Sequence, residues 1–67
     1  MKILVNGNLK QFETTSMTIA ELVNALNIVG KRIAVECNGE IVPRSQYDQV
    51  TLKEGDELEV VGAVGGG

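Results

Sequence analysis

Residues 17–27, MTIAELVNALN, contain the local signal that decides the fold. Thr18 is followed three residues later by Glu21, which is the spacing of a capping box: the Thr18 hydroxyl accepts a hydrogen bond from the backbone N–H of Glu21, and the Glu21 carboxylate accepts one from the N–H of Thr18. The apolar residues then recur at helical spacing, at Ile19, Leu22, Val23 and Leu26. The pattern predicts one helix over residues 19–26, ended by Asn27 and Gly30, with a single apolar face that packs against a sheet.

A β-hairpin is predicted before the helix. Residues 3–5 (Ile-Leu-Val) are apolar, and the Asn6-Gly7 dipeptide after them favours a type I′ turn, in which both central residues need a positive φ. Residues 9–13 are expected as the return strand, with Phe12 as its large apolar residue. The two strands should therefore be neighbours in one sheet.

Strand patterns also follow the helix. Residues 33–37 alternate between apolar and polar side chains, which is typical of a half-buried strand. Asn38-Gly39 supplies a second turn, and residues 40–42 continue the strand pattern until Pro43. Proline has no N–H to donate to a strand ladder, so we expect the strand to end there.

The C-terminal third completes the sheet. Residues 44–49 are expected as a polar connection and residues 50–52 as a short strand. Residues 57–61 alternate again, with Leu58 and Val60 on one face. Strands on both sides of a single helix favour an α+β domain, with a mixed sheet of four or five strands and one helix packed across it.

Composition excludes several classes of function. Six Lys and Arg against nine Asp and Glu give a net charge of −3, and aromatic residues make up 3%, so a nucleic-acid-binding surface is not expected. Cys37 is the single cysteine, so no disulfide forms within the chain, and no apolar stretch is long enough to cross a membrane. We expect a cytoplasmic protein.

Glycine dominates the last six residues, Gly62-Ala63-Val64-Gly65-Gly66-Gly67. We place the folded domain at residues 1–61 and a flexible tail at residues 62–67, because glycines bury little surface and lose much entropy when they are ordered. Glycine also fits a narrow channel that a Cβ would obstruct, as expected where an enzyme acts on a chain end. The alternative is a flexible end with no role of its own.

Several segments spread over the chain carry a resemblance to one family. They are Met1-Lys2-Ile3-Leu4-Val5-Asn6-Gly7, Thr18-Ile19-Ala20-Glu21-Leu22, Val35, Asn38-Gly39, Ile41-Val42-Pro43-Arg44-Ser45, Leu52-Lys53-Glu54-Gly55-Asp56-Glu57-Leu58-Glu59-Val60 and the final Gly66-Gly67. The whole chain resembles the ThiS family, the bacterial sulfur carrier proteins of thiamine biosynthesis. Those proteins have the ubiquitin-like β-grasp fold, which agrees with the order of elements expected above.

The resemblance implies a function for the tail. In that family an E1-like adenylyltransferase uses ATP to adenylate the terminal carboxylate, which becomes a thiocarboxylate and delivers sulfur to thiazole synthase. Carried over to this chain, the acceptor is the carboxylate of Gly67, and Gly66 and Gly65 belong to the tail that the partners recognise. The sulfur would come from a cysteine desulfurase or sulfurtransferase. The domain itself would bind no cofactor and would not be an enzyme.

The residues outside the tail are expected mainly in structural roles. Cys37 is expected as a small core residue, with a redox or sulfur-relay thiol as the alternative. Glu57 and Glu59 are placed on the outward face of the last strand, as an ordinary polar face or as partners for a basic rim on the adenylating enzyme. Because the sequence contains no His and one Cys, no metal site is expected. A docking patch could include one or two exposed members of a small apolar set, namely Leu4, Val5, Leu58 and Val60, although alternation assigns most of this set to the core.

Two other functions remain open from the sequence. The small subunit of molybdopterin synthase has the same fold and also carries sulfur on a terminal Gly-Gly, although residues 62–64 (Gly-Ala-Val) differ from its usual run before that diglycine. A ubiquitin-like interaction module with an unmodified tail is the other alternative. It would keep its affinity for partners after deletion of Gly66 and Gly67. A stand-alone enzyme is disfavoured, because the chain lacks a catalytic constellation and the volume for a substrate pocket.

Overall fold

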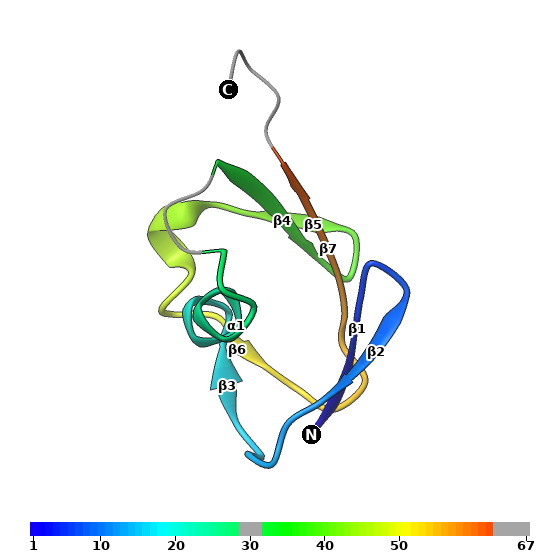
Figure 1. Ribbon diagram of the computed structural model, residues 1–67. Coiled ribbons are helices and arrows are strands. Elements are labelled where there is room, and N and C mark those ends of the chain that lie inside the picture. Colours follow the sequence, from blue (N-terminus) through cyan, green and yellow to red (C-terminus); the bar gives the residue numbers. More distant parts are fainter. Residues whose placement is uncertain (29–31, 63–67) are drawn as a thin grey trace.

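The computed structural model describes residues 1–28 and 32–62 (Figure 1). Gly65, Gly66 and Gly67, the residues expected to carry the function, lie outside the described residues. The elements in chain order are β1 (Lys2–Val5), β2 (Asn8–Gln11), β3 (Met17–Thr18), α1 (Ile19–Ala25), β4 (Ile33–Cys37), β5 (Glu40–Val42), a 3₁₀ helix (Arg44–Gln46), β6 (Thr51–Leu52) and β7 (Glu57–Gly62).

Five of the strands form one mixed sheet in the order β2-β1-β7-β4-β5. β1 and β7 are parallel, and the other neighbouring pairs are antiparallel. α1 and the small β3–β6 pair lie on the same side of this sheet (Figure 1). The predicted α+β class and the mixed sheet of up to five strands with one helix are confirmed.

The helix begins where its sequence predicts and ends one residue early, at Ala25, with Leu26 as its C-cap. Gly30, also expected at this end, lies outside the described residues. The N–H of Glu21 donates to the Thr18 hydroxyl at 3.1 Å, and the N–H of Thr18 donates to the Glu21 carboxylate at 2.8 Å, so the capping box is complete. At the other end Asn27 has φ 60°, and the N–H of Ile28 donates to the carbonyl of Val23 at 3.2 Å. That bond, with the left-handed Asn27, is a Schellman-type end that satisfies the last carbonyls.

Both Asn-Gly dipeptides form the predicted turns. Asn6 and Gly7 have φ 52° and 80°, and Asn38 and Gly39 have φ 53° and 86°, as type I′ turns require. The return strand was predicted at 9–13, but it runs over Asn8–Gln11. A two-residue turn pairs Val5 with Asn8, so the strand begins one residue earlier than predicted, and it ends at Gln11, opposite Lys2, the first residue of β1.

The core lies between α1 and the inner face of the five-stranded sheet. Its nine buried residues are Ile3, Val5, Ile19, Leu22, Val23, Val35, Tyr47, Leu52 and Leu58. The predicted helical stripe and the alternating strand residues supply most of them. The core also contains Tyr47, which the sequence pattern did not place there.

Residues 44–49 are not the plain polar connection that was predicted. They contain the 3₁₀ helix and Tyr47, whose side chain is 9% exposed. The carbonyl of Tyr47 accepts from the N–H of Ala20 at 2.8 Å, and the carbonyl of Val50 accepts from that of Ile19 at 3.1 Å. The first amides of a helix have no partner within it, so this segment packs against the start of α1 and satisfies them.

Candidate functional site: the end of β7 and the outer sheet face

The end of β7 is the part of the described chain nearest to the predicted tail. Gly62 was placed in the tail, but it is the last residue of β7, where it pairs with Ile33 of β4. The predicted acceptor Gly67 and the predicted recognition residues Gly65 and Gly66 follow it in sequence, outside the described residues. The structure therefore fixes the strand from which the tail continues.

A mainly apolar hollow of about 350 Å³ adjoins the end of β7. It lies between the C-terminal end of α1 and the sheet, and Leu26, Ile28, Val60 and Gly62 are among its lining residues. Its volume lies near the lower end of the range for small-molecule sites, and Asn6 and Arg32 are its lining residues with polar side chains.

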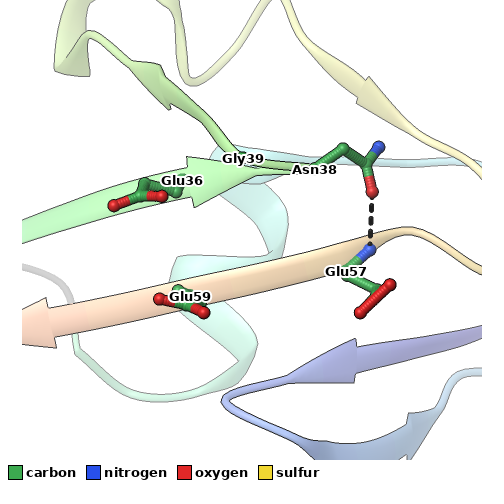
Figure 2. Close-up of a pocket in the computed structure, with 5 residues that line it drawn as sticks. All are labelled: Glu36, Asn38, Gly39, Glu57 and Glu59. Carbon is green, nitrogen blue, oxygen red and sulfur yellow. Dashed lines mark hydrogen bonds between the residues drawn. The ribbon is translucent and has the colours of Figure 1, made fainter.

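Three glutamates lie together on the outer face of the sheet, which is the face turned away from α1. Glu36 of β4 lies directly opposite Glu59 of β7, and Glu57 lies two residues before Glu59 on the same face. Together with Asn38 and Gly39 they line a shallow hollow of about 270 Å³ (Figure 2). The side-chain oxygen of Asn38 accepts from the N–H of Glu57 at 3.0 Å, the bond drawn in Figure 2. Like charges placed directly opposite on a sheet repel one another, so this face is suited to a cationic partner.

Exposed apolar side chains flank the glutamates. Leu9, Ile41 and Val61 are 63%, 73% and 54% exposed. Ile41 lies directly opposite Glu36, and Val61 is paired with Ala34. Leu9 is paired with Leu4, which is itself paired with Glu57. Because directly paired residues share a face, these side chains belong to the outer face. We call the residues of this surface the outer sheet face: Leu4, Leu9, Ala34, Glu36, Ile41, Glu57, Glu59 and Val61.

The apolar residues considered from the sequence for a docking patch are mostly core residues. Val5 and Leu58 are buried and the half-buried Val60 packs against the core, whereas the half-buried Leu4 lies on the outer face, paired with Leu9 and Glu57. The predicted outward position of Glu57 and Glu59 is confirmed by their exposure. Leu9 and Ile41 were missed, because their exposure depends on the strand register, which the sequence alone does not give.

Cys37 lies on the inner side of β4, opposite the buried Leu58, and packs against the core as expected. Burial raises the pKa of its thiol, and the nearby Asp56 and Glu40 carboxylates raise the pKa further. The thiol is therefore protonated at neutral pH and is a poor nucleophile. This environment disfavours the sulfur-relay alternative.

Residues 1–28 and 32–62 lack both a cluster of metal ligands and a membrane-spanning helix. No three side chains of His, Cys, Asp or Glu come together there in a group that could hold a metal ion. None of the helices in this part of the chain has the length and hydropathy needed to span a membrane.

Comparison with known proteins decides the family. Residues 3–67 match the family model described as the ThiS family. The chain belongs to the ThiS family. This result agrees with the resemblance found in the sequence and favours it over the molybdopterin synthase alternative.

Relatives of two lengths match this ThiS-family chain. The sulfur carrier protein ThiS of Bacillus subtilis is 33% identical over 63 residues, which cover 94% of this chain and 96% of the relative. A thiazole synthase of Paramagnetospirillum magneticum is 45% identical and one of Magnetococcus marinus 39% identical, each over all 67 residues. This chain spans about a fifth of the length of those two relatives, since the match covers 20% of each.

The fold is that of solved ThiS structures. The crystal structure of the thiamine biosynthesis protein ThiS from Geobacter metallireducens superposes with a TM-score of 0.88 and 35% identity, over 100% of both chains. The solution structure of a thiamine biosynthesis protein from the same organism gives a TM-score of 0.80 and covers 88% of that chain. The ubiquitin-like β-grasp prediction is confirmed.

Proposed function

We propose that this chain is a sulfur carrier of thiamine biosynthesis and that the carboxylate of Gly67 is its working group. The observation that carries the proposal is the match to the Bacillus subtilis sulfur carrier protein ThiS, which covers 94% of this chain and 96% of that protein. A relative that matches from end to end supports a shared function more strongly than a shared fold does.

The proposed chemistry has two steps. A carboxylate oxygen of Gly67 attacks the α-phosphorus of ATP, pyrophosphate leaves, and an acyl adenylate forms. A sulfur nucleophile at the oxidation level of hydrosulfide then attacks the acyl carbon, AMP leaves, and a thiocarboxylate remains. The first step is needed because a carboxylate is ionised at neutral pH and is a poor electrophile, whereas the adenylate supplies a leaving group.

The partners supply the catalytic groups in this proposal. An E1-like adenylyltransferase binds the ATP, and a cysteine desulfurase or sulfurtransferase carries the sulfur as a persulfide. A thiol reductant releases hydrosulfide from that persulfide and is oxidised to a disulfide. Thiazole synthase receives the sulfur from the carrier, and all these partners act in the cytoplasm. The match of the whole chain within two proteins named thiazole synthase supports the last of these partners. The protonated, half-buried Cys37 supports a carrier that has no sulfur-relay thiol of its own.

The tail is the part of the chain that the partners must enclose. We propose that Gly65 and Gly66 are the recognition residues, because glycine lets the backbone enter a channel too narrow for a Cβ. Gly62 still belongs to β7, so the segment available for insertion begins after it. Residues 63–67 would then connect the folded domain to the enzyme's active site.

Intact mass measurement tests this function directly. The chain is incubated with an E1-like adenylating enzyme, ATP and sulfide, with a sample without ATP and a variant lacking Gly67 as controls. We expect a mass gain equal to replacement of one oxygen by sulfur only in the complete mixture with the full chain. If the mass does not change but binding of the enzyme survives deletion of Gly66 and Gly67, the chain is an interaction module instead.

A further inference from the structure

β7 extends beyond its neighbour β1. The last parallel pair joins Val5 to Leu58, after which the chain turns away at Asn6-Gly7. β7 nevertheless continues to Gly62, where it pairs with Ile33 of β4. In Figure 1 the end of β7, coloured red, lies beyond the tip of the β1–β2 hairpin. The final residues of β7 therefore have a strand partner on one side only.

The side chain of Asn6 bonds to β7 where β1 has ended. The backbone N–H of Asn6 donates to the carbonyl of Leu58 at 2.9 Å, as the last bond of the ladder. Its side-chain oxygen accepts from the N–H of Val60 at 2.8 Å, and its side-chain nitrogen donates to the carbonyl of Val60 at 3.0 Å. Backbone groups two residues apart point to the same side of a strand, so the backbone groups of Val60 face the same side as the carbonyl of Leu58. The side-chain amide of Asn6 therefore makes the bonds to Val60 that the backbone of a further β1 residue would make. We call this pair of side-chain bonds the Asn6 clamp.

We propose, on the basis of the function proposed above, that Asn6 is a positioning residue for modification of the chain end. The Asn6 clamp holds Val60 two residues before β7 ends, and so sets the direction in which the following residues leave the sheet. An enzyme that receives the tail in a narrow channel then meets a strand that is already ordered. Asn6 touches no reacting atom and acts only through β7.

Loss of the Asn6 clamp should change the kinetics of modification, because the enzyme would then have to order the end of β7 itself. Without the clamp, the N–H and carbonyl of Val60 are open to water on that side, and the end of β7 is held by β4 alone. The enzyme must then order this segment when it binds the chain. That cost weakens ground-state and transition-state binding equally, so it raises KM and leaves kcat unchanged.

Asn38 provides a matched control within the same chain. It has nearly the same backbone conformation as Asn6, with φ 53° against 52°, and it is also followed by glycine. Its N–H donates to the carbonyl of Glu57 at 2.7 Å, and its side-chain oxygen accepts from the N–H of Glu57 at 3.0 Å. Asn38 therefore bonds to the first residue of β7, at the end of the strand far from the tail.

The test compares Asn6→Gly with Asn38→Gly. Glycine accepts a positive φ without strain, so both variants keep their turns and lose only the amide. Both variants are studied under conditions in which they are folded. Amide hydrogen exchange of Val60 is measured by NMR, and steady-state adenylation is measured with an E1-like enzyme and ATP. For Asn6→Gly we expect Val60 exchange to speed up by about fivefold and KM for the chain to rise by about fivefold, with kcat within about twofold. Asn38→Gly should leave Val60 exchange within about twofold of the wild type.

The outcomes separate this inference from the proposed function. Unchanged Val60 exchange in Asn6→Gly overturns the clamp, whether or not the chain is adenylated. Faster Val60 exchange with unchanged KM overturns the positioning role, and an equal increase of Val60 exchange in Asn38→Gly overturns the clamp. Failure of the wild-type chain to be adenylated counts against the proposed function, and the exchange measurement still decides on the clamp. Asn6→Asp keeps the acceptor for the Val60 N–H and loses the donor, and its KM should lie between those of the wild type and Asn6→Gly.

Discussion

The two faces of the five-stranded sheet differ in almost every physical property. On the inner face, Ile3, Val35 and Leu58 are buried beneath α1 and its neighbours. On the outer sheet face, glutamates lie directly opposite each other, and large apolar side chains such as Ile41 remain exposed. The buried side chains of the inner face stabilise the fold. The paired glutamates and exposed apolar side chains of the outer sheet face do not contribute to the stability of the fold. A surface of that kind is where contacts with other molecules are expected.

Truncation of matched residues on the two faces tests this difference most strongly. Leu58→Ala, at a position 1% exposed, should lower the free energy of unfolding by about 3 kcal/mol, because it leaves a cavity against α1. Val61→Ala, on the same strand but facing outward, should change it by less than about 0.5 kcal/mol. Urea denaturation measures both variants. Equal losses would contradict the assignment of the two faces.

Removal of the helix cap tests how much α1, which covers the inner face, contributes to stability. Thr18→Ala deletes the hydroxyl that accepts from the N–H of Glu21 and should destabilise the fold by about 1 kcal/mol. Thr15→Ala, at an exposed position before the helix, is the matched control and should have little effect. Thermal or urea unfolding distinguishes them. A Thr18 variant as stable as its control would show that the cap does not hold α1 over the sheet.

Charge reversal tests the repulsion on the outer sheet face. Glu59→Lys replaces a like-charge pair with Glu36 by an opposite-charge pair and should stabilise the fold by about 0.5 kcal/mol at low salt. The gain should shrink as salt is added, because exposed charges are screened. Glu13→Lys, outside the sheet, makes the same change in net charge and controls for it. A destabilised Glu59→Lys would mean that the glutamates do not oppose folding.

The smallest effect is the dependence of stability on the Cys37 thiol. Its raised pKa means that the folded chain binds this proton more tightly than the unfolded chain does. The stabilising contribution is therefore complete below the ordinary thiol pKa and is lost as pH rises through the raised value. Stability should fall over that alkaline range, and alkylation of the folded chain should be slower than that of a free thiol at the same pH. Cys37→Ala, which we also expect to remain competent in sulfur transfer, should lack this thiol-dependent part of the decline.

Long-range contacts explain what the sequence failed to predict. The short strand expected at residues 50–52 is present as β6, but its partner β3 has only two residues, too few to show a period, and the pairing of these strands joins Met17 to Leu52. Tyr47 lies among polar residues, and its burial follows from the need of α1 for acceptors at its first amides. The bonds between Asn6 and Val60 join residues 54 positions apart, which no local pattern contains.

The sequence by itself determined the elements whose energies are local. The Thr18–Glu21 capping box, the helix stop at Asn27 and the two Asn-Gly turns depend on residues within a few positions of each other, and all were predicted correctly. The interpretation of Gly67 as the acceptor also came from the sequence, through the family resemblance. Only the tertiary structure decided which apolar side chains remain outside and what holds the end of β7. Both depend on the register between distant strands, which is fixed when the whole core packs at once.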